Sequence, residues 1–290
     1  MKSYIDCVHC YLKQCVSCME LAGVGEDRMF EIMNELLDYV KSFNREDSPA
    51  CNSSRAILKT YELTGAEDPY RTAKKESNDL ALGLYGRLKE IILKSGDGLY
   101  TALKISVAGN VIDLGINRNY DVESSLRHSL ETGFTLDHYQ KFLTKLQQSD
   151  AIVILGDNAG EIVFDRLLVE ELKTRGREVI YIVKSGPVLN DSTIEDSVYT
   201  GMDKVARVLA NGMNYLGTYI DGVTSEVREI LKNSQVIIAK GQANFESLEA
   251  EKWAQNRVFF LLKAKCENVA KAIGVNFGDV VFFARNGNNK

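Results

Sequence analysis

The sequence predicts an α/β fold, in which a helical first half (residues 1–148) packs on a mostly parallel sheet formed by the second half (residues 149–290). Two observations predict this fold. Before Ser149, apolar residues recur at spacings of three and four, which is the period of amphipathic helices. After Ser149, short β-rich runs alternate with helical stretches, which is typical of parallel strands joined by right-handed crossovers, with helices on both faces.

The helical pattern of the first half is clearest in three segments, which are residues 29–43, 78–95 and 137–150. A proline in the segment 64–78 marks a helix start, because proline is favoured in the first turn. The residues GINRNYD (115–121) predict a loop.

Five short β-rich runs predict the strands, which are residues 151–155, 178–183, 204–209, 235–239 and 278–283. Residues 164–176 and 225–233 show the helical period between them. The apolar run 258–264 fits a strand or a buried helix equally well, because a short run does not separate the two. Without a flexible linker between the halves, a cleft where they meet is the expected place for a site.

The composition and charge of the chain indicate which kinds of molecule it binds. A chain of 290 residues with 45% hydrophobic and 26% charged residues can bury a sizeable core. The net charge of −5 and the scattered Lys and Arg residues argue against binding to nucleic acid or an anionic membrane. The N-terminus lacks the apolar stretch of a signal peptide, and no segment approaches the roughly 20 apolar residues of a membrane span. We therefore expect a cytoplasmic protein that acts on small molecules, whereas its oligomeric state cannot be predicted from the sequence.

Charged and amide side chains follow three of the predicted strands. The first strand is followed by GDNAGE (156–161), the second by KSGPVLNDSTIED (184–196) and the fourth by KGQANFE (240–246). In an open α/β sheet, ligands bind beyond the carboxyl ends of the strands. These three loops therefore predict the functional edge of the sheet.

The acidic loops predict a divalent metal ion and, through it, an anion. Asp157, Asn158 and Asp191 supply oxygen ligands of the kind preferred by Mg²⁺ or Mn²⁺. GDNAGE matches neither a P-loop nor the dinucleotide fingerprint, and an acidic loop repels phosphate unless a cation lies between them. Lys184, Lys240 and Lys263, at or near the ends of apolar runs, would complete a positive environment.

A structural interpretation of the same residues stands beside the functional one. Asp and Asn at a strand-to-helix junction often cap the helix, and lysines near strand ends are often simply solvated. The enrichment of three successive loops on one edge is what favours a site.

The chain resembles a known family in several motifs. GDNAGE (156–161), KSGPVLNDSTIEDS (184–197), KGQANFESL (240–248) and LLKAKC (261–266) are similar to signature segments of the domain-of-unknown-function-89 family, also called damage-control phosphatases. The resemblance extends to the N-terminal CVHC with Gln14, to residues 68–78 and to AGNVIDLG (108–115). It implies a helical domain on a three-layer α/β/α, Rossmann-like domain, and metal-dependent hydrolysis of phosphate monoesters such as sugar phosphates.

The resemblance also implies roles for individual residues. Asp157 and Asn158 match the family's metal-binding pair, Asp191 matches its second acidic ligand, and Lys263 matches the lysine proposed to hold the phosphate. Other polar motif positions are assigned to substrate binding in general, and these are Asn110, Lys240, Asn244 and Glu246. Lys184 joins them from its place at a strand end. Asp157 is then either a metal ligand only or also a nucleophile that forms an aspartyl phosphate.

We therefore expect a phosphatase that uses Mg²⁺, Mn²⁺, Co²⁺ or Ni²⁺ to hydrolyse small phosphorylated metabolites. Two alternatives stay open. A glycine loop after the first strand also suits an S-adenosylmethionine-dependent carboxyl methyltransferase, and the chain could instead bind a metal or metabolite without catalysis.

Four cysteines stand near the N-terminus as C-x2-C-x4-C-x2-C, at positions 7, 10, 15 and 18. The two pairs are closer together than in usual structural zinc sites. If residues 5–20 form one helix, positions 7, 10, 11, 14 and 18 share a face, so buried thiols are the favoured interpretation over a metal site. The family pattern has the first pair and lacks the second, so a cluster of all four departs from it.

Overall fold

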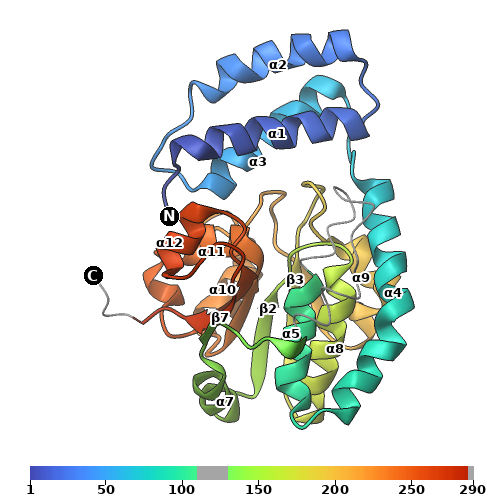
Figure 1. Cartoon of the computed structure of the whole chain (residues 1–290), viewed down its shortest axis with the longest axis vertical. Coiled ribbons are helices and arrows are strands. Elements are labelled where there is room, and N and C mark those ends of the chain that lie inside the picture. The colour runs from blue at the N-terminus through green and yellow to red at the C-terminus, as the bar shows by residue number, and fades with distance from the viewer. Residues whose placement is uncertain (110–129, 287–290) are drawn as a thin grey trace.

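The computed structural model describes residues 1–109 and 130–286. Three helices form a layer on one side of the molecule, above the carboxyl edge of a sheet (Figure 1). They are α1 (Ile5–Leu21), α2 (Glu26–Val40) and α3 (Pro49–Thr64). α4 (Arg71–Lys94) leads from this layer down along the side of the sheet (Figure 1).

Within the described residues, seven strands form one sheet in the order β1-β7-β6-β5-β2-β3-β4. The strands are β1 (Leu136–Asp137), β2 (Ala151–Leu155), β3 (Glu178–Val183), β4 (Arg207–Ala210), β5 (Ile237–Lys240), β6 (Val258–Lys263) and β7 (Val280–Ala284). All neighbours are parallel except β6 and β7. The sheet is therefore mostly parallel, as the alternation of strands and helices predicts.

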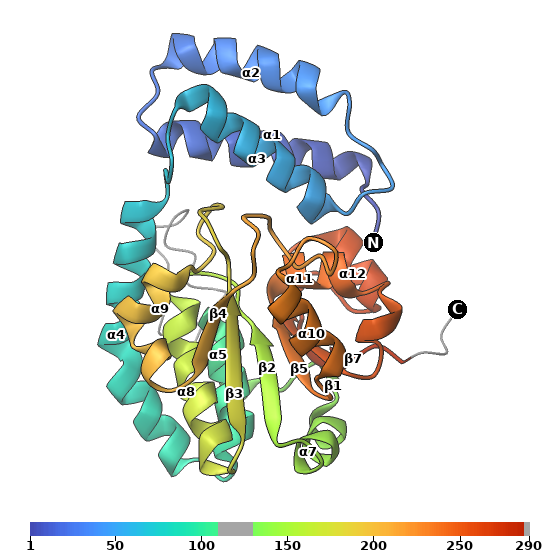
Figure 2. The ribbon, with the colours of Figure 1, turned by 180° about the vertical axis from the view of Figure 1, so that it is seen from behind.

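Helices cover both faces of this sheet, and each face packs into a separate hydrophobic core (Figure 2). Ile152 and Ile154 of β2 belong to a core shared with α4, α5 (Gly98–Ala108), α7 (Tyr139–Gln147) and α8 (Glu161–Thr174). Val153 and Leu155 belong to a second core with α10 (Ser225–Asn233), α11 (Gly241–Leu248) and α12 (Glu267–Ile273). Side chains alternate along a strand, so one apolar run fills both cores. The α/β fold class is confirmed.

The boundaries of the predicted elements differ by a few residues in several places. α10 matches the predicted range, whereas α8 begins at Glu161 rather than at residue 164. The run 204–209 divides into the end of a 3-10 helix (Met202–Lys204) and the strand β4. Most of the ambiguous run 258–264 forms the strand β6, which lies between β5 and β7 in the sheet.

Several elements carry no clear periodic signal in the sequence. α3 buries Asn52, Ser53, Ser54 and Thr60, so polar residues occupy the face that packs. α5 is apolar on most sides because it is enclosed between the sheet and its neighbours. α9 (Ile194–Thr200) is only seven residues long.

The division of the chain at residue 148 stays a prediction. β1 precedes this position in the sequence but pairs with β7, and α4 and α5 lie with α8 over the sheet (Figure 1). The predicted loop 115–121 and Asn110 lie outside the described residues.

The α1 cysteines are free thiols. Cys7, Cys15 and Cys18 are buried, whereas Cys10 is exposed. The prediction that position 10 lies on the buried face of this helix was therefore wrong. Burial raises the pKa of Cys15 to about 11 and that of Cys18 to about 12. These two thiols are core residues. In the described parts of the chain, no helix combines the length and the apolar character needed to cross a bilayer.

Candidate active site

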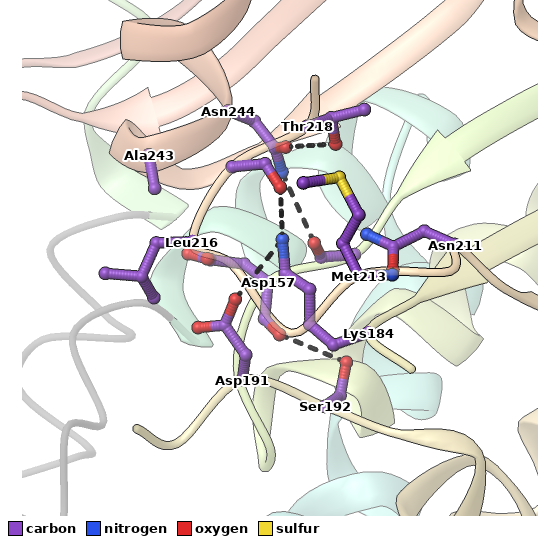
Figure 3. A network of polar contacts seen from close by, with 12 residues as sticks. Asp157, Lys184, Asp191, Ser192, Asn211, Met213, Leu216, Thr218, Ala243 and Asn244 are labelled. Atoms are coloured by element: carbon purple, nitrogen blue, oxygen red, sulfur yellow. Dashed lines mark hydrogen bonds and ion pairs between the residues drawn. The ribbon is translucent and has the colours of Figure 1, made fainter. Parts of the chain in front are cut away.

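The loops that follow β2 and β3 meet at the carboxyl edge of the sheet, beneath the helical layer (Figure 2). Asn158 and Asp191 form an isolated antiparallel bridge, and Lys184 and Thr193 form a parallel one. The carbonyl oxygen of Asp157 accepts hydrogen bonds from the backbone N–H of Ser192 at 2.8 Å and from its hydroxyl at 3.0 Å. These contacts bring Asp157 and Asp191 to one place (Figure 3).

Both aspartates are buried, and this burial disfavours their charged forms. It raises the pKa of Asp157 to about 7, with the charge of Asp191 adding to the effect. Burial raises the pKa of Asp191 to about 6, and the charge of Lys184 opposes the rise. Asp191 Oδ2 lies 3.5 Å from Lys184 Nζ, and it accepts no hydrogen bond from the described residues. A second cation, in addition to the Lys184 ammonium, would therefore stabilise the ionised form of the two aspartates.

Gly241, the first residue of α11, makes room for the Asp157 carboxylate. Its φ of +77° lies in the region that favours glycine, and a Cβ at this position would come within 1.9 Å of Asp157 Oδ2. The KGQANFE segment thus shapes the site with its glycine as well as with its polar side chains.

A buried group of charged side chains is connected to the aspartates through Asn158. Asn158 Nδ2 donates to Glu161 Oε1 at 2.8 Å, and Glu161 Oε2 lies 3.2 Å from Lys240 Nζ. Lys240 Nζ also donates to Asp165 Oδ1 at 2.7 Å and to the carbonyl of Ser106 at 2.9 Å. Burial raises the pKa of Glu161 to about 7. Burial also opposes the charge of Lys240, but the carboxylates of Asp165 and Glu161 outweigh it and raise the Lys240 pKa.

Asn244, predicted to bind substrate, joins three loops at this edge. Its Nδ2 donates to the carbonyl of Lys240 at 2.8 Å and to that of Gly156 at 3.3 Å. Its Oδ1 accepts a hydrogen bond from the Thr218 hydroxyl at 2.8 Å (Figure 3). The side chain therefore fixes the positions of the strand ends around Asp157.

Lys184 and Glu246 also have internal partners. Lys184 Nζ donates to the carbonyl of Gly217, in addition to its ion pair with Asp191 (Figure 3). Glu246 accepts a hydrogen bond from Gln242 Nε2 at 2.8 Å, and burial raises its pKa to about 7. It faces the start of α1, where its charge acts on the thiols of Cys7 and Cys10.

The ligand set for a metal ion is consequently small. In residues 1–109 and 130–286, no three His, Cys, Asp or Glu side chains form a ready-made metal cluster. The set predicted from the sequence consists of two carboxylates and the Asn158 amide, all of which present oxygen. Such a set fits a hard cation that keeps several waters.

The comparison with known proteins identifies the family. The family profile described as the damage-control phosphatase ARMT1-like domain matches residues 3–281. The chain belongs to this family. A damage-control phosphatase from Archaeoglobus fulgidus is 34% identical over 281 residues, which cover 95% of this chain and 96% of the relative. One from Pyrococcus horikoshii is 31% identical over 286 residues, which cover 97% of each protein.

Structural similarity agrees with this result. The crystal structure of a DUF89 family protein from Pyrococcus horikoshii matches the fold with a TM-score of 0.89 at 30% identity, covering 99% of this chain and 100% of the other. The mouse 4′-phosphopantetheine phosphatase is 33% identical over 167 residues, which are 50% of this chain and 20% of the mouse protein. The family resemblance seen in the motifs is thus confirmed.

Within this damage-control phosphatase fold, Lys265 is a further candidate that the sequence interpretation missed. Its side chain is exposed, and its positive charge lowers the pKa of both Asp157 and Glu161, although burial raises each of them overall. Lys263 ends β6 and is half-buried, and its predicted role stays a prediction. The segment LLKAKC (261–266) could have indicated Lys265, because both of its lysines lie at or just after the end of a strand and either could contact phosphate.

Glu161 and Asp165 were also missed. Glu161 is part of GDNAGE, but an acidic residue in the first turn of a helix has an ordinary explanation in the helix dipole. Asp165 lies one turn later, and nothing in its neighbours along the chain indicates that Lys240 will meet it. Both become recognisable only when β5 and α8 are placed together.

The helical layer holds the loops of the site from above. Tyr61 of α3 accepts a hydrogen bond from the backbone N–H of Leu189 at 3.0 Å, and Ser54 accepts one from that of Leu216 at 2.8 Å. Leu189 has a φ of +46°, which is unusual for leucine, and it stands two residues before Asp191. α3 therefore contributes to the position of Asp191.

Proposed function

We propose that this chain is a divalent-metal-dependent phosphatase that hydrolyses small phosphorylated metabolites, sugar phosphates among them, in metabolite damage control. The observation that carries the proposal is the buried Asp157–Asp191 pair, in which Asp191 Oδ2 has the Lys184 ammonium at 3.5 Å and no shorter hydrogen bond from the described residues. The relatives named damage-control phosphatases support the same activity, and the mouse relative is named for a phosphorylated metabolite.

Asp157, Asn158 and Asp191 fit the proposed cation, because each offers a hard oxygen ligand. We assign Mg²⁺, Mn²⁺, Co²⁺ or Ni²⁺ to this set. When bound, such an ion supplies positive charge that neutralises phosphoryl oxygens during the transfer.

The lysines at the edge have different parts in this proposal. Lys265 is exposed and its charge reaches the acidic residues, so we assign it to the phosphate that approaches from solvent. Lys263 remains the second candidate for this role. Lys184 and Lys240 are turned toward internal carboxylates and carbonyl groups, so we assign them to the support of the site.

The remaining predicted residues fall into the same scheme. Asn244 and Glu246 are assigned to the framework around the substrate, because their side chains contact other protein groups. A methyltransferase site would give the buried acidic pair no role, so that alternative is not carried forward.

The experiment is phosphate release from a panel of sugar phosphates and a chromogenic phosphate ester, after chelation and re-addition of each of the four metals. We expect activity that returns with a metal and favours a subset of the panel. Asp157→Ala should abolish it, whereas Asp203→Ala, which changes an exposed aspartate in the 3-10 helix, should not. Full activity of Asp157→Ala would refute the assigned site.

A further inference from the structure

The orientation of the Asn158 amide is determined by two carboxylates. Its Nδ2 group donates to Glu161 Oε1 at 2.8 Å and lies 3.3 Å from Asp157 Oδ2. The reversed amide would place its oxygen against two carboxylate oxygens, which have no proton to donate when ionised. Both contacts therefore leave Asn158 Oδ1 available to a ligand.

Glu161 is itself held on its other oxygen. Glu161 Oε2 lies 3.2 Å from Lys240 Nζ, and both side chains are buried. Lys240 is anchored in turn by Asp165 at 2.7 Å, and Asp165 Oδ2 accepts a hydrogen bond from the Tyr181 hydroxyl at 2.7 Å. A buried network in which these polar groups are paired is rigid, because each group has few other partners.

We propose that Glu161 is a positioning residue, which orients the Asn158 amide so that its oxygen is presented to a divalent cation. This inference rests on the proposed function, since it takes Asn158 as a metal ligand. Lys240 and Asp165 keep Glu161 in place. This role explains why Lys240, the last residue of β5, points into the protein rather than toward solvent. Loss of a residue that orients a metal ligand typically weakens metal affinity about 10- to 100-fold.

The test is a Mn²⁺ titration of the full, chelator-stripped chain, with free Mn²⁺ followed by electron paramagnetic resonance. In Glu161→Gln, the new amide turns its oxygen to Lys240 and its NH₂ group to Asn158, so two donors face each other. We expect a Kd for Mn²⁺ at least about 10-fold above that of the unchanged protein. Asp165→Asn loosens Lys240, which holds Glu161, without contacting Asn158, so we expect a loss of Mn²⁺ affinity in the same direction and no larger than that of Glu161→Gln.

A paired exchange separates orientation from general disruption. In the double variant Glu161→Gln with Asn158→Asp, the amide donates to the new carboxylate, which offers an oxygen to the ion whichever way it turns. We expect the Mn²⁺ affinity to recover toward that of the unchanged protein. Unchanged affinity in Glu161→Gln, or no recovery in the double variant, would each overturn the inference.

Two further variants complete the experiment. Glu178→Gln changes an exposed glutamate at the start of β3 and should leave the titration unchanged. Asp157→Ala tests the proposed metal site itself, and unchanged Mn²⁺ affinity in this variant would refute that site. If Asp157→Ala loses Mn²⁺ binding while Glu161→Gln retains it, only the positioning role fails. Far-ultraviolet circular dichroism identifies any variant that is not folded.

Discussion

The hydroxyl and backbone N–H groups of Ser192 both donate to the carbonyl oxygen of Asp157, at 3.0 and 2.8 Å (Figure 3). This contact joins the loops after two neighbouring strands and places Asp191, the residue before Ser192, beside Asp157. Two carboxylates that desolvation disfavours are thereby held together by the backbone. The proposed cation would offset this cost when bound and so would stabilise the folded protein.

The first prediction concerns the pH dependence of the metal-free protein. Folding raises the pKa of Asp157 to about 7 and that of Asp191 to about 6, above the usual value near 3.8. The unfolded state therefore loses these protons at lower pH than the folded state does, so the free energy of unfolding falls as pH rises from about 4 to about 7. We expect thermal unfolding in chelator to occur several degrees lower at pH 8 than at pH 5.5.

Asp157→Asn provides the comparison for this pH effect, because an amide does not titrate. The variant should show a smaller difference between the two pH values than the unchanged protein does. Asp203→Asn, at an exposed position, should keep the full difference. An equal pH dependence in all three proteins would contradict the assignment to Asp157.

The second prediction concerns the room that Gly241 leaves for Asp157. In Gly241→Ala, the new methyl group would lie within 1.9 Å of Asp157 Oδ2 and the backbone would be strained at φ +77°. We expect the variant to lose Mn²⁺ binding and phosphate release. Gly176→Ala is a matched control, since Gly176 has φ +74° but nothing within 4 Å of a new Cβ. It should cost about 1 kcal/mol of stability from strain and leave activity intact. Similar activity in the two variants would contradict the argument.

The third prediction separates the two lysines at the end of β6. Lys265→Met should raise KM for the phosphate substrate by about 10-fold or more, because we assign this exposed cation to the incoming phosphate. It should also raise the pKa of the acidic limb of the pH–rate profile, since the Lys265 charge lowers the pKa of Asp157 and Glu161. Lys263→Met measures the role inferred from the family, and Lys271→Met on α12 serves as an exposed control. A larger effect of Lys263→Met than of Lys265→Met would reverse our assignment.

The fourth prediction concerns the helical layer. Tyr61→Phe removes the acceptor of the Leu189 N–H and leaves a buried donor without its partner. We expect the free energy of unfolding to fall by roughly 1–3 kcal/mol, as for other buried donors left unpaired. Because Leu189 stands two residues before Asp191, Mn²⁺ affinity should fall as well. Tyr39→Phe, on the outer helix α2, is the control and should change neither quantity. If Tyr61→Phe loses stability but keeps full Mn²⁺ affinity, α3 has only a structural role.

Much of the fold could be predicted because the apolar runs of the second half are distinct. Val153 and Leu155 belong to one core and Ile152 and Ile154 to the other, which is the pattern of a strand buried on both faces. α3 was not predicted, because the side chains that it buries include Ser54 and Thr60. Their hydroxyl groups donate hydrogen bonds to backbone carbonyl oxygens one turn earlier in the helix. Periodicity detects apolar faces, and it does not detect a polar face that is satisfied by hydrogen bonds.

The site could be predicted in part for a similar reason. Asp157, Asn158 and Asp191 follow strands directly, so their place at the edge follows from the topology. The inward direction of Lys240 could not be predicted, because it depends on Asp165 and Ser106, which belong to other elements. A lysine at a strand end has the same appearance in the sequence whether it meets a substrate or a buried carboxylate.

The most direct test of the central claim, that Asp157 and Asp191 jointly hold an ion required for phosphate release, is a metal add-back assay. Phosphate release is measured for the chelator-stripped chain and for Asp191→Asn as Mn²⁺ is increased. We predict that the unchanged chain recovers activity to saturation, whereas Asp191→Asn recovers little at any Mn²⁺ concentration. Full activity of the stripped chain without metal, or equal recovery of both proteins, would contradict the account.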